Sequence, residues 1–184
     1  MHRNSDNVLT EWLVLSAQGG KAVAVNRLLK IWYPKFLRYS TRQLNDSDAA
    51  KDVVQDTLVL IARKIRKLKE PAAFPKWAYQ ILHRRGVDYQ RSEIRRRTRE
   101  AKSEPADSPV PGDANPEFEF DTQQTVHDAL AELDSTSYIV VHLYYLHDLS
   151  LREIASICSI PVGTVKSRLH TARGKLKKLL EEKL

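Results

Sequence analysis

Apolar residues recur at intervals of three and four through the C-terminal part of the chain. Between positions 162 and 176 their spacings are 3, 4, 3 and 4, which places them all on one side of an α-helix. A shorter apolar set over residues 151–158 has a similar spacing. The sequence therefore predicts two helices separated by a turn at Ser159 and Ile160. The apolar residues are Leu151, Ile154, Ala155 and Cys158 in the first helix, and Val162, Val165, Leu169, Ala172 and Leu176 in the second.

Capping residues support both helix starts. Ser150 precedes the first apolar run and Glu153 follows three residues later, which is the S-x-x-E pattern of a capping box. Pro161 is expected at the first position of the second helix, where its missing N–H removes no helical hydrogen bond.

The side of the second helix opposite its apolar residues carries small or short polar side chains, with cations along both edges. Small side chains let a helix approach the floor of a DNA major groove, and long cations beside them reach base edges and phosphates. This pattern is typical of the recognition helix of a helix-turn-helix. An amphipathic hairpin with a solvated basic rim is the alternative. The face consists of Gly163, Ser167, His170, Thr171 and Gly174, with Lys166 and Arg173 along one edge and Thr164, Arg168 and Lys175 along the other.

Helical spacing also dominates residues 1–99, so the predicted fold class is all-α. A first helix around residues 8–17 ends at two glycines, and a longer helix containing Pro34 follows. A third begins at residues 45–47 and runs to about Leu68, and a fourth follows Pro71. Their core-facing sets are Leu28, Leu29, Trp32, Phe36, Leu37 and Tyr39; then Ala50, Val54, Thr57, Leu58, Ile61, Ile65 and Leu68; then Phe74, Trp77, Ala78, Ile81 and Leu82.

The third of these helices has an acidic outer face that includes one valine. Its members are Asp48, Asp52, Gln55, Asp56 and Val59. An apolar side chain among exposed carboxylates favours a contact with another protein. The carboxylate spacing also permits a divalent metal, as in a nuclease. That alternative is disfavoured because metal sites usually draw ligands from several elements, and the macrodipole favours carboxylates near a helix N-terminus in any case.

The fourth helix becomes strongly cationic after its apolar stripe, with aromatic residues interleaved. Arginines beside aromatic rings suit phosphate contact and base stacking, which is how separated nucleic-acid strands are held. The alternative assigns Trp77 and the tyrosines to the core and the arginines to solvent, and for Trp77 a core role is favoured. The residues concerned are Trp77, Tyr79 and Tyr89, and Arg84, Arg85, Arg91, Arg95, Arg96, Arg97 and Arg99.

Charge is distributed unevenly along the 184 residues, whose formal net charge is +7. Residues 1–99 carry 21 basic and 9 acidic side chains, whereas residues 100–121 carry 1 and 7 and hold four of the eight prolines. A segment so poor in apolar residues cannot bury enough surface to order itself. We therefore expect two small helical domains, residues 1–99 and 122–184, joined by a flexible acidic linker at residues 100–121.

Composition excludes several classes of protein. No apolar run of 18 residues exists, and the N-terminus lacks a signal-peptide core, so neither membrane insertion nor secretion is expected. The single cysteine excludes an internal disulfide, and a cytoplasmic protein is predicted. His142, His147 and Cys158 match no common zinc spacing, so no metal or cofactor is expected.

Three segments resemble the parts of bacterial RNA polymerase sigma factors. SDAAKDVVQDTLVLIARKI resembles the helix that docks on the polymerase, and FPKWAYQILHRRGVDYQRSEIRRR is similar to the segment that melts the promoter and binds the minus-10 element. ALAELDSTSYIVVHLYYLHDLSLREIASICSIPVGTVKSRLHTARGKL resembles the domain that binds the minus-35 element. In this order they resemble the extracytoplasmic-function (ECF) class, which keeps these two domains and a linker.

The resemblance implies a polymerase subunit that selects promoters, performs no chemistry of its own and is restrained by an anti-sigma factor. A helix-turn-helix regulator that acts without polymerase is the alternative. The resemblance implies polymerase contacts for Asp48, Asp52, Gln55, Asp56 and Val59; minus-10 contacts for Trp77, Tyr79, Arg84, Arg85, Asp88, Arg91 and Arg95; and minus-35 contacts for Thr164, Lys166, Ser167, Arg168, His170 and Arg173.

Three positions depart from the family pattern. Arg84 stands where the family usually has Asn at an extruded base, which puts the minus-10 base preference in doubt. Thr171 replaces a frequent arginine on the recognition face, and Ser159 replaces the common turn glycine.

Overall fold

The computed structural model describes residues 5–100 and 129–181, and every regular element within these ranges is a helix. The all-α fold class is therefore confirmed. The chain divides into two compact units, Met1–Pro111 and Gly112–Leu184. Apart from Glu100, the expected linker at residues 100–121 lies outside the described ranges, and the domain boundaries remain predictions.

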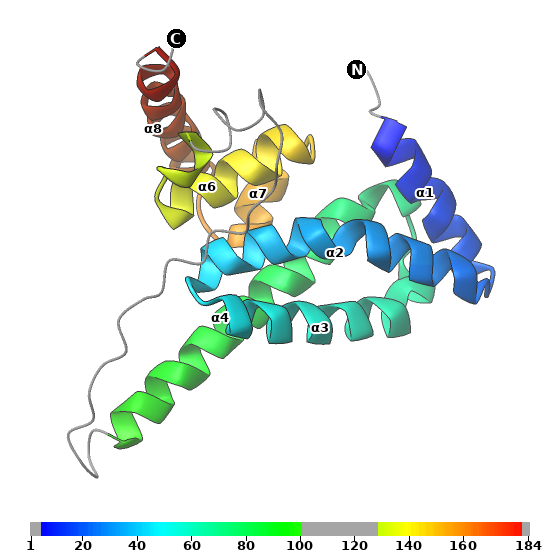
Figure 1. Cartoon of the computed structure of the whole chain (residues 1–184). Coiled ribbons are helices and arrows are strands. Elements are labelled where there is room, and N and C mark those ends of the chain that lie inside the picture. The colour runs from blue at the N-terminus through cyan, green and yellow to red at the C-terminus, as the bar shows by residue number, and fades with distance from the viewer. Residues whose placement is uncertain (1–4, 101–128, 182–184) are drawn as a thin grey trace. The chain divides into compact units, whose positions relative to one another are not determined.

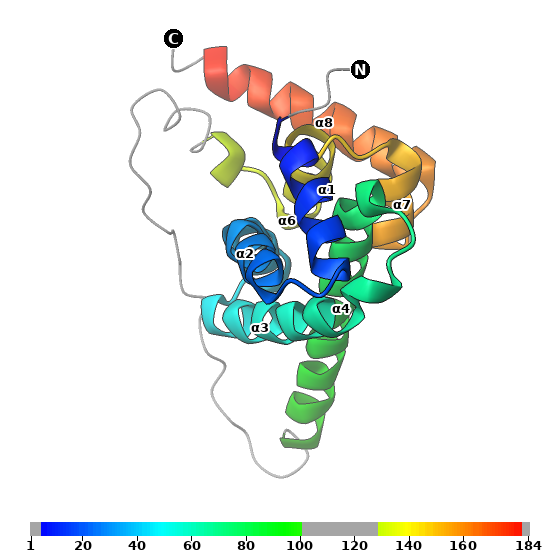
Figure 2. The ribbon, with the colours of Figure 1, turned by 90° about the vertical axis from the view of Figure 1, so that its right-hand side faces the viewer.

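The first unit is a bundle of four helices (Figures 1 and 2). Helix α1 (Ser5–Gln18) ends before Gly20, whose φ of 88° suits glycine, and α2 (Ala22–Leu44) continues through Pro34. Asn45, in the left-handed conformation, ends α2. The Asp46 side chain then accepts hydrogen bonds from the amides of Asp48 and Ala49 at the start of α3 (Ser47–Lys64).

The first unit is completed by two short 3₁₀ helices and the long helix α4. The 3₁₀ helix η1 (Ile65–Lys67) follows α3, so α3 ends four residues before the predicted Leu68. The second, η2 (Pro71–Ala73), leads into α4 (Phe74–Glu100). The C-terminal part of α4 extends beyond the other helices of the unit in both views (Figures 1 and 2), which leaves its arginines exposed.

Aromatic side chains form the centre of the first unit. Trp32 contacts the rings of Phe36, Phe74 and Tyr79 at centroid distances of 5.4, 5.2 and 6.1 Å, and Tyr39 lies 5.0 Å from Tyr79. All five are at most 1% exposed. Burial of a large apolar side chain contributes roughly 1.5–3 kcal/mol, so this cluster joins α2 to α4 strongly.

The second unit contains the predicted pair of helices and an additional helical segment before them. Helix α6 (Ser135–Val141) continues into a π-helical turn, η3 (His142–Leu146), which the sequence did not predict. Helices α7 (Leu151–Cys158) and α8 (Val162–Glu181) follow.

The turn between α7 and α8 agrees closely with the sequence prediction. The capping box of Ser150 and Glu153 is present, with both reciprocal bonds. Ser159 adopts a left-handed conformation with φ 53° at the end of α7. Pro161 precedes the first residue of α8, one position earlier than predicted. In α7, Ile157 is buried in place of Cys158, which is half-buried.

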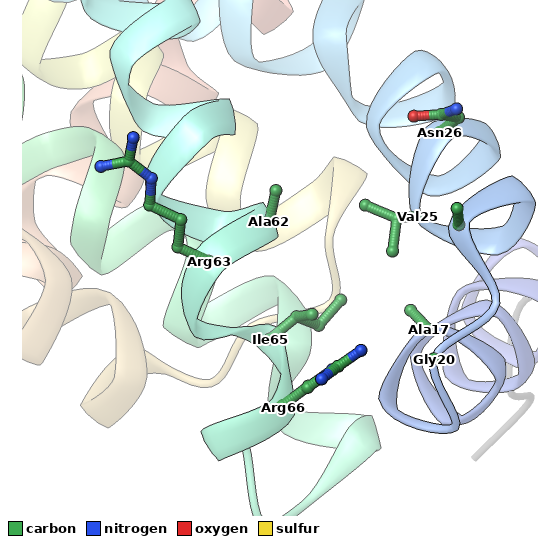
Figure 3. Close-up of a pocket in the computed structure, with 9 residues that line it drawn as sticks. Ala17, Gly20, Val25, Asn26, Ala62, Arg63, Ile65 and Arg66 are labelled. Atoms are coloured by element: carbon green, nitrogen blue, oxygen red, sulfur yellow. The ribbon is translucent and has the colours of Figure 1, made fainter.

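A pocket of about 350 Å³ lies where α1, α2 and the end of α3 meet (Figure 3). Small residues such as Ala17, Gly20 and Ala22 leave the space, and the Arg66 side chain extends toward Gly20. None of the described helices is long and apolar enough to cross a membrane.

Candidate nucleic-acid and polymerase interfaces

Helix α8 presents the predicted polar face to solvent. Val165, Leu169 and Ala172 are buried on its inner side. The opposite side is free of large apolar groups, and a Cβ added at either Gly163 or Gly174 would meet nothing within 4 Å. The face therefore has open space in front of it. Its exposed members are Gly163, Lys166, Ser167, His170, Thr171, Arg173, Gly174 and Lys175, while Thr164 and Arg168 are half-buried at the edge.

The cations of α8 differ in their partners. Lys175 lies 3.7 Å from a carboxylate oxygen of Asp134, and Lys177 lies 3.6 Å from one of Glu181. Lys166, Arg168 and Arg173 pair with no carboxylate within the described ranges, so their charge is not neutralised there. Unpaired cations beside small residues suit an anionic partner such as DNA.

Arg173 is held by aromatic residues of η3. Its Nε donates a hydrogen bond to the Tyr145 hydroxyl at 2.6 Å. The guanidinium carbon lies 5.7 Å from the ring centroids of both Tyr144 and Tyr145. The bond to the Tyr145 hydroxyl is the main reason that the pKa of Arg173 lies above its ordinary value. Sequence reasoning assigned neither tyrosine a role, and the adjacent pair at the end of an apolar run was the available signal.

Helix α4 is anchored to α2 in its middle, and its C-terminal part extends beyond the other described helices of the unit (Figures 1 and 2). The Tyr39 hydroxyl lies 2.9 Å from His83 Nδ1, and burial lowers the pKa of this histidine. Gln43 Nε2 donates to the His83 carbonyl at 3.0 Å, and Gln90 Nε2 donates to the Gln43 carbonyl at the same distance. These bonds fix the direction in which the arginine-rich end of α4 extends.

Apart from Tyr79, the predicted minus-10 residues of α4 fall into two groups. Trp77 and Arg85 are half-buried, whereas Arg84, Asp88, Arg91 and Arg95 are exposed. The four arginines among them form no ion pair with a described carboxylate, whereas Arg96 and Arg97 both contact Glu93.

Tyr79 lies in the core of the first unit. It is 0% exposed and packs against Trp32, Phe36 and Tyr39, so the nucleic-acid contact predicted for it is wrong. Its ring completes the core of the first unit.

Helix α3 brings the predicted polymerase-binding residues onto one exposed face. Asp48, Asp52, Gln55 and Asp56 are exposed, and Val59 is 44% exposed beside them. Asp48 pairs with Lys51 at 2.9 Å, whereas Asp52 and Asp56 lack an ion pair with any described cation. The face therefore keeps a net negative charge with an apolar side chain at one end, which suits a basic protein surface.

The described residues contain no group of three or more His, Cys, Asp or Glu side chains that could hold a metal ion. His142 and His147 are buried with ring centroids 5.0 Å apart, and Tyr138 stacks near His142 at 5.6 Å. These histidines therefore belong to the core of the second unit.

Two family models match the chain. Residues 28–98 match sigma-70 region 2, which covers most of α2, α3 and α4. Residues 123–176 match sigma-70 region 4, which includes α6, α7 and most of α8.

Curated relatives match nearly the full length of the chain. The ECF RNA polymerase sigma-E factor of Haemophilus influenzae is 28% identical over 178 residues, which cover 92% of this chain and 94% of the relative. The ECF RNA polymerase sigma factor SigW of Bacillus subtilis is 28% identical over 170 residues, with coverage of 84% and 88%.

Solved structures share the fold. The sigma factor RpoE of Bartonella quintana, in complex with the anti-sigma factor NepR, matches with a TM-score of 0.57 and 25% identity, covering 85% of this chain and 96% of that one. CnrH, in complex with the cytosolic domain of CnrY, matches with a TM-score of 0.56 and 22% identity over 95% and 98% of the two chains.

The region 2 match lies in the first unit and the region 4 match lies in the second. The chain belongs to the sigma-70 family and is an ECF-type sigma factor, a class that binds core RNA polymerase and directs transcription initiation at promoters.

Proposed function

We propose that three separate surfaces of this sigma factor bind different partners during transcription initiation. The exposed face of α8 reads the minus-35 duplex, α4 holds the separated minus-10 strand, and the acidic face of α3 binds core polymerase. The observation that carries the proposal is the pattern of charge. Within the described ranges, the cations assigned to DNA have no carboxylate partner, unlike their neighbours Lys175, Lys177, Arg96 and Arg97, while the α3 face is acidic. The cations concerned are Lys166, Arg168 and Arg173 on α8, and Arg84, Arg85, Arg91 and Arg95 on α4.

On α8, we assign base contacts to Ser167 and His170 on the open face and to Lys166 at one edge, and phosphate contacts to the other edge residues. Lys166, Ser167 and His170 reach base edges in the major groove, because short side chains on that side allow close approach. Thr164, Arg168 and Arg173 contact phosphates, which fixes the register of the helix on the duplex.

On α4, the four arginines without carboxylate partners contact the backbone of the melted strand. The half-buried Trp77, 6.0 Å from Phe74 between ring centroids, is at the start of the same surface. Stacking on an aromatic ring and backbone contact by arginine are both tolerant of sequence. Arg84, Arg85, Asp88, Arg91 and Arg95 complete the proposed minus-10 surface, together with the loop at residues 69–73.

On α3, the polymerase-docking face comprises Asp48, Asp52, Gln55, Asp56 and Val59. Complementary charge steers association and suppresses wrong partners. The exposed Val59 supplies apolar area that a purely solvated acidic helix would not need.

The proposal also covers the domain organisation, the cellular location and the regulation of the chain. Domains of residues 1–99 and 122–184, joined by residues 100–121, act by binding alone with no chemical step, in the cytoplasm. The RpoE match is a complex with an anti-sigma factor. We accordingly expect such a partner to bind this chain and to prevent polymerase docking.

Transcription in vitro tests this proposal. Core RNA polymerase is mixed with the full chain and a pool of genomic fragments, and transcript starts are mapped. We expect discrete starts that require the chain, preceded by two shared sequence elements. A chain that binds DNA while leaving polymerase output unchanged would contradict the proposal and favour an independent regulator.

A further inference from the structure

We infer that Tyr145 is a positioning residue for DNA binding, because its hydroxyl fixes the guanidinium of Arg173 at the edge of α8 in readiness for a phosphate. The inference rests on the proposed function of α8. It adds a residue outside the helix-turn-helix segment to the minus-35 surface.

Three contacts together fix the Arg173 side chain. The hydrogen bond from Nε to the Tyr145 hydroxyl is 2.6 Å long and joins residues 28 positions apart. The rings of Tyr144 and Tyr145 lie 4.9 Å apart at an interplanar angle of 82°, and the guanidinium carbon is 5.7 Å from both centroids. The guanidinium therefore lies beside two nearly perpendicular rings and is held by a hydrogen bond as well.

The π-helical turn η3 supplies both rings. Such turns are rare and often occur at functional sites. Within η3, His142 and Leu143 are buried while Tyr145 is 50% exposed. The turn is thus fixed to the core of the second unit at one end and presents a tyrosine hydroxyl at the surface at the other.

A neutral acceptor leaves the charge of Arg173 available. A carboxylate in the same place would neutralise it, as Asp134 and Glu181 do for Lys175 and Lys177. Arginine has five N–H donors, and only the Nε donor is used by Tyr145. The two terminal nitrogens keep the planar fork that matches a phosphate.

The contact with Tyr145 should make the protein bind every DNA sequence more tightly than it would with an unrestrained Arg173 side chain. A side chain that is already held loses less rotamer freedom when it contacts DNA. Because phosphates carry no sequence information, Tyr145 affects affinity and the register of α8 and leaves base preference unchanged.

A double-mutant cycle in the holoenzyme tests the inference. Core polymerase with the full wild-type chain first selects a minus-35 duplex from a randomised pool, and this duplex is the probe. The variants are Tyr145→Phe, which keeps the ring and removes the acceptor, Arg173→Ala, and the two combined. Tyr33→Phe, an exposed tyrosine of the first unit, is the matched control. Affinity is measured across a series of KCl concentrations.

Arg173→Ala should reduce the slope of log K against log salt by about one unit, the value for one lost phosphate contact. Tyr145→Phe should keep the wild-type slope and weaken binding roughly twofold to tenfold, because the fork must now be ordered on binding. In the Arg173→Ala background it should have no further effect. Tyr33→Phe should match wild type.

Two results overturn the inference in different ways. If Arg173→Ala changes the slope while Tyr145→Phe binds as tightly as wild type, or weakens binding equally in both backgrounds, then Tyr145 does not position Arg173. If the wild-type holoenzyme enriches no sequence and Arg173→Ala leaves the slope unchanged, then the proposed function of α8 is wrong and the inference fails with it.

Discussion

Lys166 and Arg168 lie on opposite edges of the exposed face of α8, and the proposal gives them different contacts. Lys166→Ala should cost about 1–3 kcal/mol on the cognate minus-35 duplex and relax the preference at one base pair. Arg168→Ala should weaken binding to all sequences alike and reduce the salt slope by about one unit. Fluorescence anisotropy with duplexes that differ at single base pairs measures both.

A matched control removes one charge elsewhere. Lys30→Ala on α2 loses an exposed cation outside the proposed contacts, so it should retain both the preference and the salt slope. Equal loss of preference in the Lys166 and Arg168 variants would show that the assignment of base and phosphate contacts is wrong.

Gly86 permits the close crossing of α2 and α4. A Cβ at this position would lie 2.5 Å from Cδ of Gln43, whose Nε2 donates to the His83 carbonyl. Gly86→Ala should therefore displace Gln43, and losing its hydrogen bond costs about 1 kcal/mol. This loss offsets most of the gain from replacing a helical glycine by alanine, so the free energy of unfolding should change little. All three tryptophans belong to the first unit, so their fluorescence during urea denaturation reports its stability.

The same substitution should be clearly stabilising once Gln43 is shortened. In a Gln43→Ala background the added methyl group has space, and alanine is favoured over glycine in a helix by about 0.8–1 kcal/mol. Gly86→Ala should then stabilise the first unit. Destabilisation in both backgrounds would show that another group limits the crossing.

At the scale of elements, the start of α6 depends on one carboxylate. Asp134 accepts hydrogen bonds from the Thr136 hydroxyl and the Ser137 amide at 2.7 and 3.0 Å. The bond from Thr136 is the largest cause of its lowered pKa, followed by those from Ser137, and Lys175 adds to the effect. Asp134→Ala should cost about 0.5–2 kcal/mol, the range for loss of an N-cap.

The pH dependence of this cap has a definite sign. Because the folded-state pKa of Asp134 lies below its ordinary value of 3.8, the charged form stabilises the fold above that value, and this stabilisation is lost as the pH falls through the folded-state pKa. Asp134→Asn keeps a capping oxygen and does not titrate. Urea denaturation followed by NMR signals of α6 should show a wild-type advantage over Asp134→Asn at pH 7 that shrinks below pH 3.8. An advantage independent of pH would exclude the carboxylate charge as its source.

Local signals explain which elements could be predicted from the sequence. The capping box at Ser150 and the three-and-four spacing of α8 involve residues within one or two turns, so both appear as predicted. The π-helical turn η3 lies within a continuous apolar and aromatic run that gives no local sign of an i→i+5 turn. The contact of Tyr145 with Arg173 depends on this turn and was therefore not predictable, although the adjacent tyrosines were visible in the sequence.

Long-range packing explains the error at Tyr79. Helix α4 carries apolar or aromatic residues on more than one side, and periodicity alone does not say which side faces α2. The rings of Trp32, Phe36 and Tyr39, about 40 residues earlier in the chain, determine that Tyr79 is buried. The arginines of α4 were easier to place, because no core of this size accepts so many cations.

For the whole molecule, the proposed function requires the two units to act through one polymerase, and it assigns polymerase docking to the acidic face of α3. Asp52 lies within that face, exposed and without an ion pair to any described cation. Asp52→Lys reverses its charge while leaving the buried side of α3 intact, so stability should change by less than about 0.5 kcal/mol. Binding to core polymerase should fall by at least about tenfold, since juxtaposed like charges cost several kcal/mol.

The matched control is Glu132→Lys, which makes the same charge change at an exposed position of the second unit. It should bind core polymerase like wild type in a pull-down and support transcription. Asp52→Lys should lose both, yet keep the thermal unfolding profile of the wild-type chain. The cations on α4 and α8 that are proposed to contact DNA are unchanged in this variant, so only their delivery to the promoter by polymerase is lost. Equal polymerase binding by the two variants would show that the α3 face is ordinary solvated surface without a docking role.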